Sequence, residues 1–513
     1  MDKEKARAIA AALALIMVLA SCTKTHNVGE RDTLVVISQV APFSLDPAKT
    51  NDSASAQIMK QIYETLFNQN YQTMIAMPSL AERHAFETNA EGQPVYLRLF
   101  IKQGVLFHNG RELKAGDVKF SLERAMESPY TMHIVDAVGS VDVVGDYEVL
   151  ITLKYPFAPI LNHLAHTALS IVNEKAVHDG GSEYARHPVG TGPLQFVNWV
   201  AGNRIELRRW DKFHGNPARI KNITVRYITD PATAVLELET GGGDLYLHLD
   251  NQPQDVSRIE ANPDINVFKA QSLRINYMGF NFRKPPFNDI RVRKAILHAI
   301  DIDVLVNNVW QGIGSSGRGP ISSRVWASAA SQLEQYEYDV EKARQLLSEA
   351  GYPDGFSTSL SVNEAQDRVD AATIINNMLA QVGIRVDLNV MEWATYMDYT
   401  SNGEHDLFIL GWTTVTGDPN YGLELFHTRA FGSAGNTNFY SNRTVDQLLD
   451  RGRTETDTAK REEIYLEAQR IIHSEAPWLY LFEGEYVIGA RKGVSGFEIS
   501  PAGHHPLWNV YFE

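Results

Sequence analysis

The sequence predicts a mixed α/β protein whose sheets contain parallel strands. Hydrophobic residues make up 44% and charged residues 21%, a balance typical of a well-packed globular chain. Short β-branched runs, such as residues 34–40, occur between longer stretches of helical spacing. Near residue 382 a predicted helix leads directly into a strand, an order typical of parallel sheet units. At 513 residues the chain is long enough for about three domains or two large lobes.

The predicted elements follow one another with few breaks. Residues 34–40 form a buried strand, and a helix over 52–67 follows because apolar side chains recur at Ile58, Ile62 and Leu66 after a polar start. The other expected strands are 94–101, two strands within 141–153, 204–209, 223–228 and 384–390, and the other expected helices are 115–126, 291–309, 340–350 and 371–382.

Glycines predict two sharp changes of direction. The run that begins at Gly241 follows a helical stretch and is typical of a helix end. Gly190, Gly192 and Pro193 predict a rigid turn in which a glycine supplies a positive φ and proline fixes its own φ.

Charge and cysteine content exclude several classes of protein. The chain has 47 Lys and Arg against 62 Asp and Glu, a net charge of −15. Nucleic-acid binding needs a basic surface, so it is not expected. A single cysteine excludes a disulfide scaffold, a thiolate zinc cluster and an iron–sulfur protein.

The first 22 residues predict export and lipidation. Lys3, Lys5 and Arg7 precede residues 9–21, an uncharged run that is short for a spanning helix and typical of a signal peptide. The run ends in Leu-Ala-Ser-Cys, which resembles a bacterial lipobox and predicts lipidation of Cys22 after removal of residues 1–21. The alternative is a plain secretory signal with a chance cysteine. Residues 22–30 are expected to be a polar, lipidated tether.

Motifs of enzymes are scarce. The sequence contains no Walker phosphate loop, no H-E-x-x-H and no G-x-S-x-G. Gly312, Gly314 and Gly317 match G-x-G-x-x-G, but they follow a predicted helix, whereas a dinucleotide loop follows a strand. His163 and His166 are spaced like a helical pair, and a chance pair is the simpler explanation among 16 histidines. We therefore expect no enzyme, no metal site and no cofactor.

Six spaced segments resemble the extracellular solute-binding protein family 5, the peptide-, nickel- and glutathione-type receptors of ABC importers. In order along the chain they are residues 77–82 (MPSLAE), 107–120 (FHNGRELKAGDVKF), 187–193 (HPVGTGP), 281–301 (with FRKPPF, VRKA and AID), 338–351 (YDVEKARQLLSEAG) and 411–419 (GWTTVTGDP). The resemblance extends from about residue 33 to residue 513.

The resemblance implies a bilobed, periplasmic-binding-protein-like clamshell of the cluster C type. Lobe one is expected over residues 31–272 with an extra subdomain near 71–190, and residues 483–513 return to it. Lobe two is expected over 273–482. Two crossing strands near 273–282 and 479–488 would form the hinge, and ligand binding between the lobes would favour the closed form.

The resemblance also implies a function. The chain would be a monomeric receptor that captures a peptide or a peptide-like molecule such as glutathione and delivers it to separate permease and ATPase subunits. Lipidated Cys22 would hold it at the periplasmic or extracellular face of the membrane. Two alternatives remain open: a receptor for a nickel or haem chelate, with His405 and His427 to be examined, and a surface lipoprotein with an adhesion, signalling or chaperone role.

The ligand loop departs from the peptide-receptor pattern. That pattern resembles G-W-x-x-D, whose Asp holds the α-ammonium of the peptide, whereas Val415 occupies the fifth position here. A buried ammonium without a carboxylate is unfavourable. Either Asp418, Glu392 or Asp46 reaches the amine, or the ligand is not an ordinary α-peptide. The loop is similar to the G-W-x-x-x-T-G loops of glutathione-type receptors.

Arg368 is the expected partner of a ligand carboxylate, because its position is similar to one where arginines of the family meet a carboxylate and its planar fork binds carboxylate through two hydrogen bonds. The alternative is a surface arginine paired with Asp367 or Asp370.

The remaining expected ligand contacts are aromatic and polar. They are Trp393 and Trp412 as pocket walls, with core packing as the alternative; Thr413, Thr414 and Asp418 in the loop; and Phe43 and Asp46, with Ser44, after the first strand.

Overall fold

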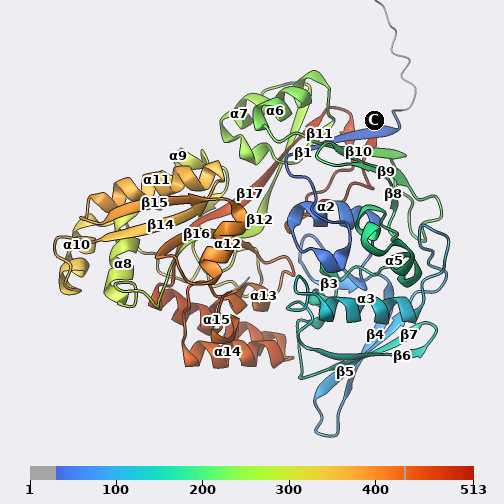
Figure 1. Cartoon of the computed structure of the whole chain (residues 1–513), viewed down its shortest axis with the longest axis horizontal. Helices are drawn as coiled ribbons and strands as arrows, with labels where there is room; N and C mark the ends of the chain where they lie inside the picture. The colour runs from blue at the N-terminus through green and yellow to red at the C-terminus, as the bar shows by residue number, and fades with distance from the viewer. Residues whose placement is uncertain (1–30, 433–434) are drawn as a thin grey trace, which may run out of the picture.

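The structure is a computed structural model, and it describes residues 31–432 and 435–513. Two groups of elements lie side by side, one mostly blue and green and the other mostly yellow and orange, and two long strands run between them (Figure 1). The bilobed arrangement predicted from the sequence is confirmed. The predicted signal peptide, the tether and Cys22 lie outside the described residues.

The sheet of lobe one is built around the first strand of the chain, which has parallel neighbours on both sides. In order across the sheet the strands are β11 (Leu245–Tyr246), β1 (Thr33–Ser38), β10 (Asn222–Tyr227), β9 (Arg204–Arg209) and β8 (Leu194–Val200). The helices of this lobe are α2 (Ser53–Ile62), α5 (Glu174–Gly180), α6 (Pro231–Thr240) and α7 (Pro253–Glu260).

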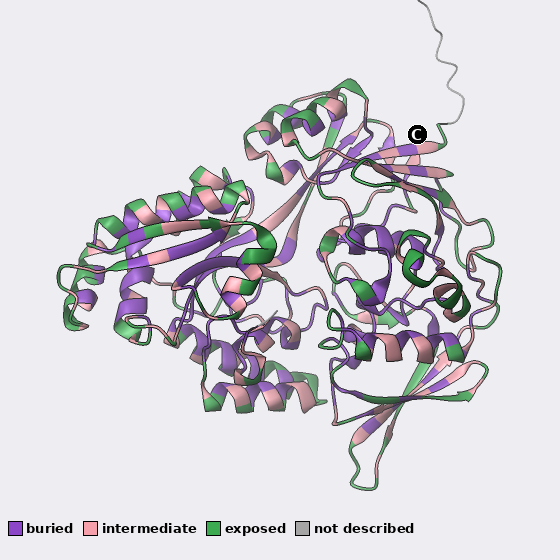
Figure 2. Cartoon of the chain, in the orientation of Figure 1, coloured by how far each residue is buried: buried purple, intermediate pink, exposed green. Residues whose placement is uncertain are grey.

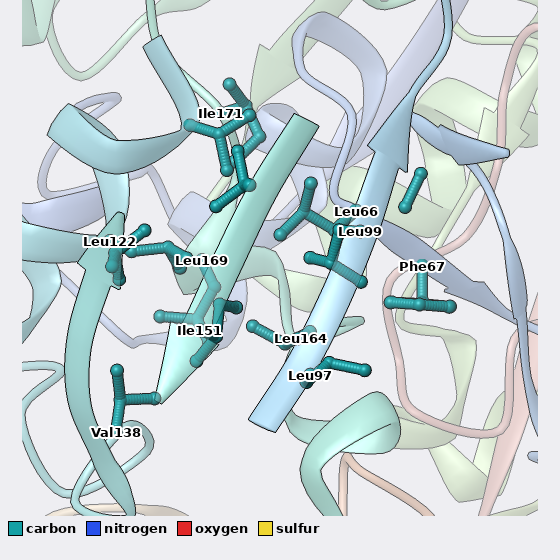
Figure 3. Packing of buried hydrophobic residues seen from close by; sticks show 14 of the residues in the cluster. Leu66, Phe67, Leu97, Leu99, Leu122, Val138, Ile151, Leu164, Leu169 and Ile171 are labelled. Atoms are coloured by element: carbon teal, nitrogen blue, oxygen red, sulfur yellow. The ribbon is translucent and has the colours of Figure 1, made fainter. Parts of the chain in front are cut away.

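A separate four-stranded antiparallel sheet forms the subdomain of lobe one. Its order is β4 (Ala81–Thr88), β5 (Pro94–Ile101), β7 (Glu148–Leu153) and β6 (Val138–Gly145), with α3 (Ala115–Glu127) beside it and α4 (Ile160–His163) following. Alternate residues of β5 are buried, as its period of two requires. Figure 3 shows Leu97 and Leu99 of this strand in one cluster with Ile151, Leu164 and Leu169.

Two antiparallel strands connect the lobes. β12 (Ile265–Phe280) and β17 (Trp478–Arg491) pair from Ile265 opposite Arg491 to Gly279 opposite Trp478. The register shifts between Gln271 and Ile275, so the backbone bulges between the lobes. Through these strands the sheets of both lobes form one continuous ladder.

Lobe two continues that ladder beyond β12. Its strands are β16 (Leu407–Thr413), β14 (Ser357–Asn363) and β15 (Arg385–Met391), the last two being parallel. Its helices are α8 (Ile290–Ala299), α9 (Ile302–Val309), α10 (Val340–Glu349), α11 (Gln366–Ala380), α12 (Trp393–Ser401), α13 (Pro419–Leu423), α14 (Arg443–Thr454) and α15 (Thr458–Glu475). Buried residues concentrate in β14 and β16, whereas exposed residues lie on the edge strand β15 and on the outer faces of the helices (Figure 2).

Short elements complete the chain. The strands are β2 (Phe67–Gln69), β3 (Ala76–Pro78), β13 (Ser315–Ser316), β18 (Val494–Ser495) and β19 (Tyr511–Phe512), and the 3-10 helices are η1 (Pro47–Lys49), η2 (Thr167–Leu169), η3 (Gly181–Arg186), η4 (Leu249–Asn251), η5 (Glu424–Phe426) and η6 (Thr428–Ala430). Within the described ranges, no helix combines the length and the apolar character needed to cross a membrane.

Two local predictions were wrong. The expected helix over 291–309 is divided into α8 and α9, because Asp301 accepts a hydrogen bond from the N–H of Val304 and caps a new helix. Gly190 and Gly192 do not have positive φ. They are required for space, since a Cβ on Gly190 would lie 2.2 Å from the carbonyl oxygen of Ile62. The helix end at Gly241 is confirmed, with φ of 84°.

Candidate functional site

The lobes meet at residues 414–418, which follow β16 and are called the 414–418 loop below. Gln69 of lobe one donates from Nε2 to the carbonyl oxygen of Val415 at 2.7 Å. Asn162 donates from Nδ2 to the carbonyl oxygen of Thr416 at 2.7 Å and to that of Met74 at 3.0 Å. The loop expected to contact ligand is therefore held between the two lobes.

Arg368 is a buried cation without an anionic partner. It lies in the first turn of α11 and is 7% exposed. Its Nη1 donates to Oδ1 of Asn363 at 2.6 Å, and its guanidinium carbon lies 5.7 Å from the ring centre of Trp393. Neither Asp367 nor Asp370 forms an ion pair with it, nor does any other carboxylate of the described residues. Burial lowers the pKa of the Arg368 guanidinium below its ordinary value.

A second arginine lies close to the first. Arg274 belongs to β12, opposite Thr413 of β16, and its Nε donates to Oδ1 of Asn276 at 3.1 Å. Its positive charge further lowers the pKa of Arg368. Two neighbouring cations, one of them buried, make this part of the molecule attractive to an anion.

The two tryptophans differ in environment. Trp393 begins α12 and is 46% exposed, with Arg368 near the ring. Trp412 is half-buried, and its ring centre lies 5.4 Å from that of Tyr421. The Nε1 of Trp412 is buried and makes no hydrogen bond.

The other expected contact residues, Phe43, Thr413 and Thr414, lie in both lobes. Phe43 of lobe one is 73% exposed, and its N–H donates to Oγ of Ser55 at 3.0 Å. Thr414 is fully buried, its N–H donates to the carbonyl oxygen of Leu273 at 3.1 Å, and its Oγ1 makes no hydrogen bond. Thr413 faces Arg274 across the strand pair.

Asp418 and Asp46, two of the expected ligand contacts, are each paired with an arginine. Both oxygens of Asp418 accept from Arg461, at 2.7 and 2.8 Å, and both side chains are buried. Both oxygens of Asp46 accept from Arg124, at 2.7 and 3.0 Å. Two-point pairing of this kind satisfies each carboxylate, so we do not include either residue in the proposed site.

Glu392 is the third acid that could replace the carboxylate missing at Val415. Glu392 caps α12 and accepts from the N–H groups of Ala394 at 2.8 Å and Thr395 at 3.2 Å. Asp418 and Asp46 are therefore already paired with arginines, whereas Glu392 has only neutral backbone partners.

Sequence reasoning missed Arg274 and Asp250. Asp250 lies in η4, and one of its oxygens accepts from the N–H of Val487 at 3.4 Å. Burial raises the pKa of Asp250 to about 7, against an opposing effect of Arg274. Arg274 is one of two charged residues of β12, with Lys269, so the strand itself gave no clear indication of it. The position of Asp250 depends on the approach of η4 to β17.

The histidines considered for metal binding do not form such a site. His405 is fully buried with its ring centre 4.7 Å from that of Phe408. His427 lies 3.5 Å from Asp446 and 3.4 Å from Asp450. In the part of the chain that the structure describes, no group of three or more His, Cys, Asp or Glu is arranged to hold a metal ion.

A cavity of about 610 Å³ lies between the subdomain and lobe two. Its wall includes Trp412 and Tyr421 from lobe two and Phe157 and His163 from lobe one. A volume of this size is typical of a small-molecule site.

Comparison with known proteins agrees with this geometry. Residues 77–433 match the model of the bacterial extracellular solute-binding proteins, family 5 (middle region). The chain belongs to this family. Its relatives in family 5 include Glutathione-binding protein GsiB of Pectobacterium atrosepticum, 31% identical with 89% of this chain and 90% of that protein covered. Heme-binding protein A of Haemophilus influenzae is 28% identical, with 99% of both chains covered.

A solved structure shows the same fold. The ABC transporter-associated periplasmic binding protein DppA of Helicobacter pylori, in complex with the peptide STSA, superposes with a TM-score of 0.84. It is 29% identical, and 94% of this chain and 98% of that chain are covered. Family 5 is a family of extracellular solute-binding proteins, so the chain is a solute-binding receptor.

Proposed function

We propose that this receptor serves an ABC importer and binds a peptide or a peptide-like molecule such as glutathione through a carboxylate of the ligand. One observation carries the proposal: Arg368 is buried, lies near Arg274 and has no carboxylate partner among the described residues. A buried charge without a partner is unfavourable by several kcal/mol, and a ligand carboxylate on Arg368 removes that cost. The names of the glutathione-binding and peptide-bound relatives support this class of ligand.

The 414–418 loop favours one kind of ligand within the peptide-like class. Val415 stands where peptide receptors of the family have an acid, and Asp418, Asp46 and Glu392 have partners of their own. A ligand that places an α-ammonium at this loop finds Asp418 and Asp46 already neutralised by arginines. Glutathione, whose γ-linked glutamate places its ammonium differently from that of an α-peptide, therefore fits better than an ordinary dipeptide.

Ligand panels test the proposal directly. The chain from Thr23 onward is mixed with reduced glutathione, oxidised glutathione, trialanine, haem or a nickel–histidine chelate, and its melting temperature is measured. A ligand at 100 times its dissociation constant stabilises the protein by about 2.7 kcal/mol. We expect a shift with glutathione. A shift with haem or the nickel chelate alone would contradict the proposal.

The proposed attachment to the membrane is lipidation of Cys22, with permease and ATPase subunits as partners of a monomeric receptor. Two acyl chains are enough for stable anchoring. Mass spectrometry of the mature N-terminus in the expressing cell should find a lipid-modified cysteine. Cys22→Ser should release the protein from the membrane fraction, and an unmodified Cys22 would contradict this part of the proposal.

The proposed lobe boundaries lie at residues 272/273 and 482/483, within β12 and β17. Closure by rotation about these strands is a hinge motion of a known kind. Small-angle X-ray scattering should show a smaller radius of gyration after glutathione is added; an unchanged radius would contradict ligand-linked closure.

A further inference from the structure

The cavity between the subdomain and lobe two contains recognition chemistry that the arginines do not account for. Neither Arg274 nor Arg368 belongs to the described residues that line it. Its apolar wall includes Met132, Phe157 and Leu425. The polar atoms of this wall therefore decide which part of a ligand it accepts.

One such atom is an unused acceptor. His163 is 3% exposed and lines the cavity. Its Nδ1 lies 2.7 Å from the carbonyl oxygen of Ile134, and because a carbonyl only accepts, Nδ1 carries the proton. Burial lowers the pKa of His163, so the ring is neutral and Nε2 has a free lone pair. Nε2 is buried and makes no hydrogen bond.

The second atom is an unused donor. Trp412 also lines the cavity, and its Nε1–H is buried without a hydrogen-bond partner. The rings of Trp412 and His163 both pack near Tyr421, with centre-to-centre distances of 5.4 and 6.0 Å. A neutral donor from lobe two and a neutral acceptor from lobe one thus lie at the same cavity. Buried polar atoms are normally hydrogen-bonded.

The two arginines of the wall pair with acids, although Nε of Arg453 is buried without a hydrogen-bond partner. Arg429 pairs with Glu424 and with Asp450, each at 2.6 Å. Arg453 pairs with Asp450 at 2.8 Å. Asp136 accepts from the hydroxyl of Tyr155 at 3.0 Å. Burial also lowers the pKa of His133, which adds no positive charge at neutral pH. An anionic ligand group therefore gains no free counter-charge from the two arginines, whereas the carboxylate of Asp136 at the cavity wall has only a neutral partner.

We propose that this cavity binds an uncharged amide group of the ligand, with Nε1–H of Trp412 donating to the amide oxygen and Nε2 of His163 accepting from the amide N–H. A peptide bond or a carboxamide side chain supplies this pairing. The assignment rests on the proposed function and refines it: the carboxylate of the ligand is read by Arg368, and its amide by residues of both lobes.

The test compares peptide bonds with esters. The probes are reduced glutathione and two analogues in which one or the other peptide N–H is replaced by an ester oxygen. Calorimetry with the wild type should show about five- to tenfold weaker binding for one of the esters, the effect of one lost hydrogen bond. His163→Phe should bind that ester and glutathione equally, whereas His163→Gln, which keeps an acceptor, should restore the preference. Trp412→Phe should weaken all three probes by a similar factor.

The outcomes separate this inference from the proposed function. A wild type that binds glutathione and both esters alike overturns the amide assignment and leaves the carboxylate assignment intact, as does a His163→Phe variant that still prefers glutathione. Trialanine and its two esters are measured in the same way. A wild type that binds neither glutathione nor trialanine overturns both proposals. The melting temperature of each variant, within a few degrees of the wild type, shows that the variant is folded.

Discussion

Two buried arginines of lobe two have opposite surroundings. Arg461 of α15 donates to both oxygens of Asp418 and also from Nε to the carbonyl oxygen of Gly452 at 2.7 Å. Arg368 of α11 donates to the neutral oxygen of Asn363 and has no ion pair within the described part of lobe two or lobe one. Arg461 therefore has an anionic partner, whereas Arg368 has none among the described residues.

In the proposed function, this difference distinguishes a residue of the scaffold from a residue that binds ligand. Asp418 lies in residues 411–419, one of the six segments that resemble the family, yet its partner is Arg461, so its charge is used to hold α13 and α15 together. Arg368 is buried without an ion pair among the described residues, and in the proposed function a ligand carboxylate offsets the cost of burying its charge. Substitutions that remove or exchange these partners test whether the two arginines differ in role.

The largest expected effect is on the completed pair. Arg461→Ala leaves the carboxylate of Asp418 buried and unpaired, so the free energy of unfolding should fall by about 3–5 kcal/mol. Urea unfolding followed by circular dichroism measures it. Arg470→Ala on the same helix is the control, because Arg470 is exposed and its Nη2 meets only Gln332. An unchanged urea midpoint for Arg461→Ala would mean that the pair does not stabilise the lobe.

Removal of Arg368 should weaken ligand binding without lowering the stability of the protein. Arg368→Ala should weaken glutathione binding at least tenfold, about 1.4 kcal/mol, because the ligand carboxylate loses its partner. The unfolding free energy without ligand should stay unchanged or rise, since an unpaired buried charge is removed. Arg344→Ala, on exposed α10, is the control for both measurements. Equal affinity for wild type and Arg368→Ala would remove Arg368 from the site.

A carboxylate introduced beside Arg368 should supply the anionic partner that this arginine lacks. Asn363→Asp changes the oxygen that Arg368 contacts at 2.6 Å into part of a carboxylate of nearly the same shape. We expect about 1 kcal/mol of added stability, the difference between a neutral and a charge-assisted hydrogen bond. Glutathione should bind about tenfold more weakly, because the introduced carboxylate would compete with that of the ligand for Arg368. If calorimetry finds affinity retained, the ligand carboxylate lies elsewhere.

A pH-dependent effect concerns Asp250, the acid near Arg274. Its pKa is about 7 in the folded chain, against an ordinary value of 3.8. The stability linked to its bound proton is present below about pH 4 and is lost as pH rises through about 7. Asp250→Asn removes this loss, so the variant should gain stability relative to wild type between pH 5 and pH 8. A difference in urea midpoint that is the same at both pH values would contradict the raised pKa.

Local sequence patterns predicted most of the elements. The period of two in residues 94–101 and the run at 204–209 match β5 and β9 to the residue. The error at 291–309 came from extending one helical period across Asp301, although an aspartate ahead of an apolar run is itself a cap signal. Helix and strand periods are local properties, so the sequence carries them directly.

Charge partners were not predictable in the same way. Asp367 and Asp370 are the acids nearest to Arg368 in sequence, and neither pairs with it, because both are exposed while Arg368 points into the protein. Asp418 and Arg461 are 43 residues apart and meet only because α15 packs beside α13. The identity of a partner depends on long-range packing, which no local pattern encodes.

The sequence alone thus determined the fold class and the bilobed family architecture, and it predicted Arg368 as the partner of a ligand carboxylate. The tertiary structure decided the rest: that Asp418 and Asp46 are already paired, that Arg274 and Asp250 lie by the crossing strands, and that His163 and Trp412 share a cavity between the lobes. The physical reason is that segment identity follows from periodicity and motif, whereas burial and hydrogen-bond satisfaction arise only when distant segments are brought together.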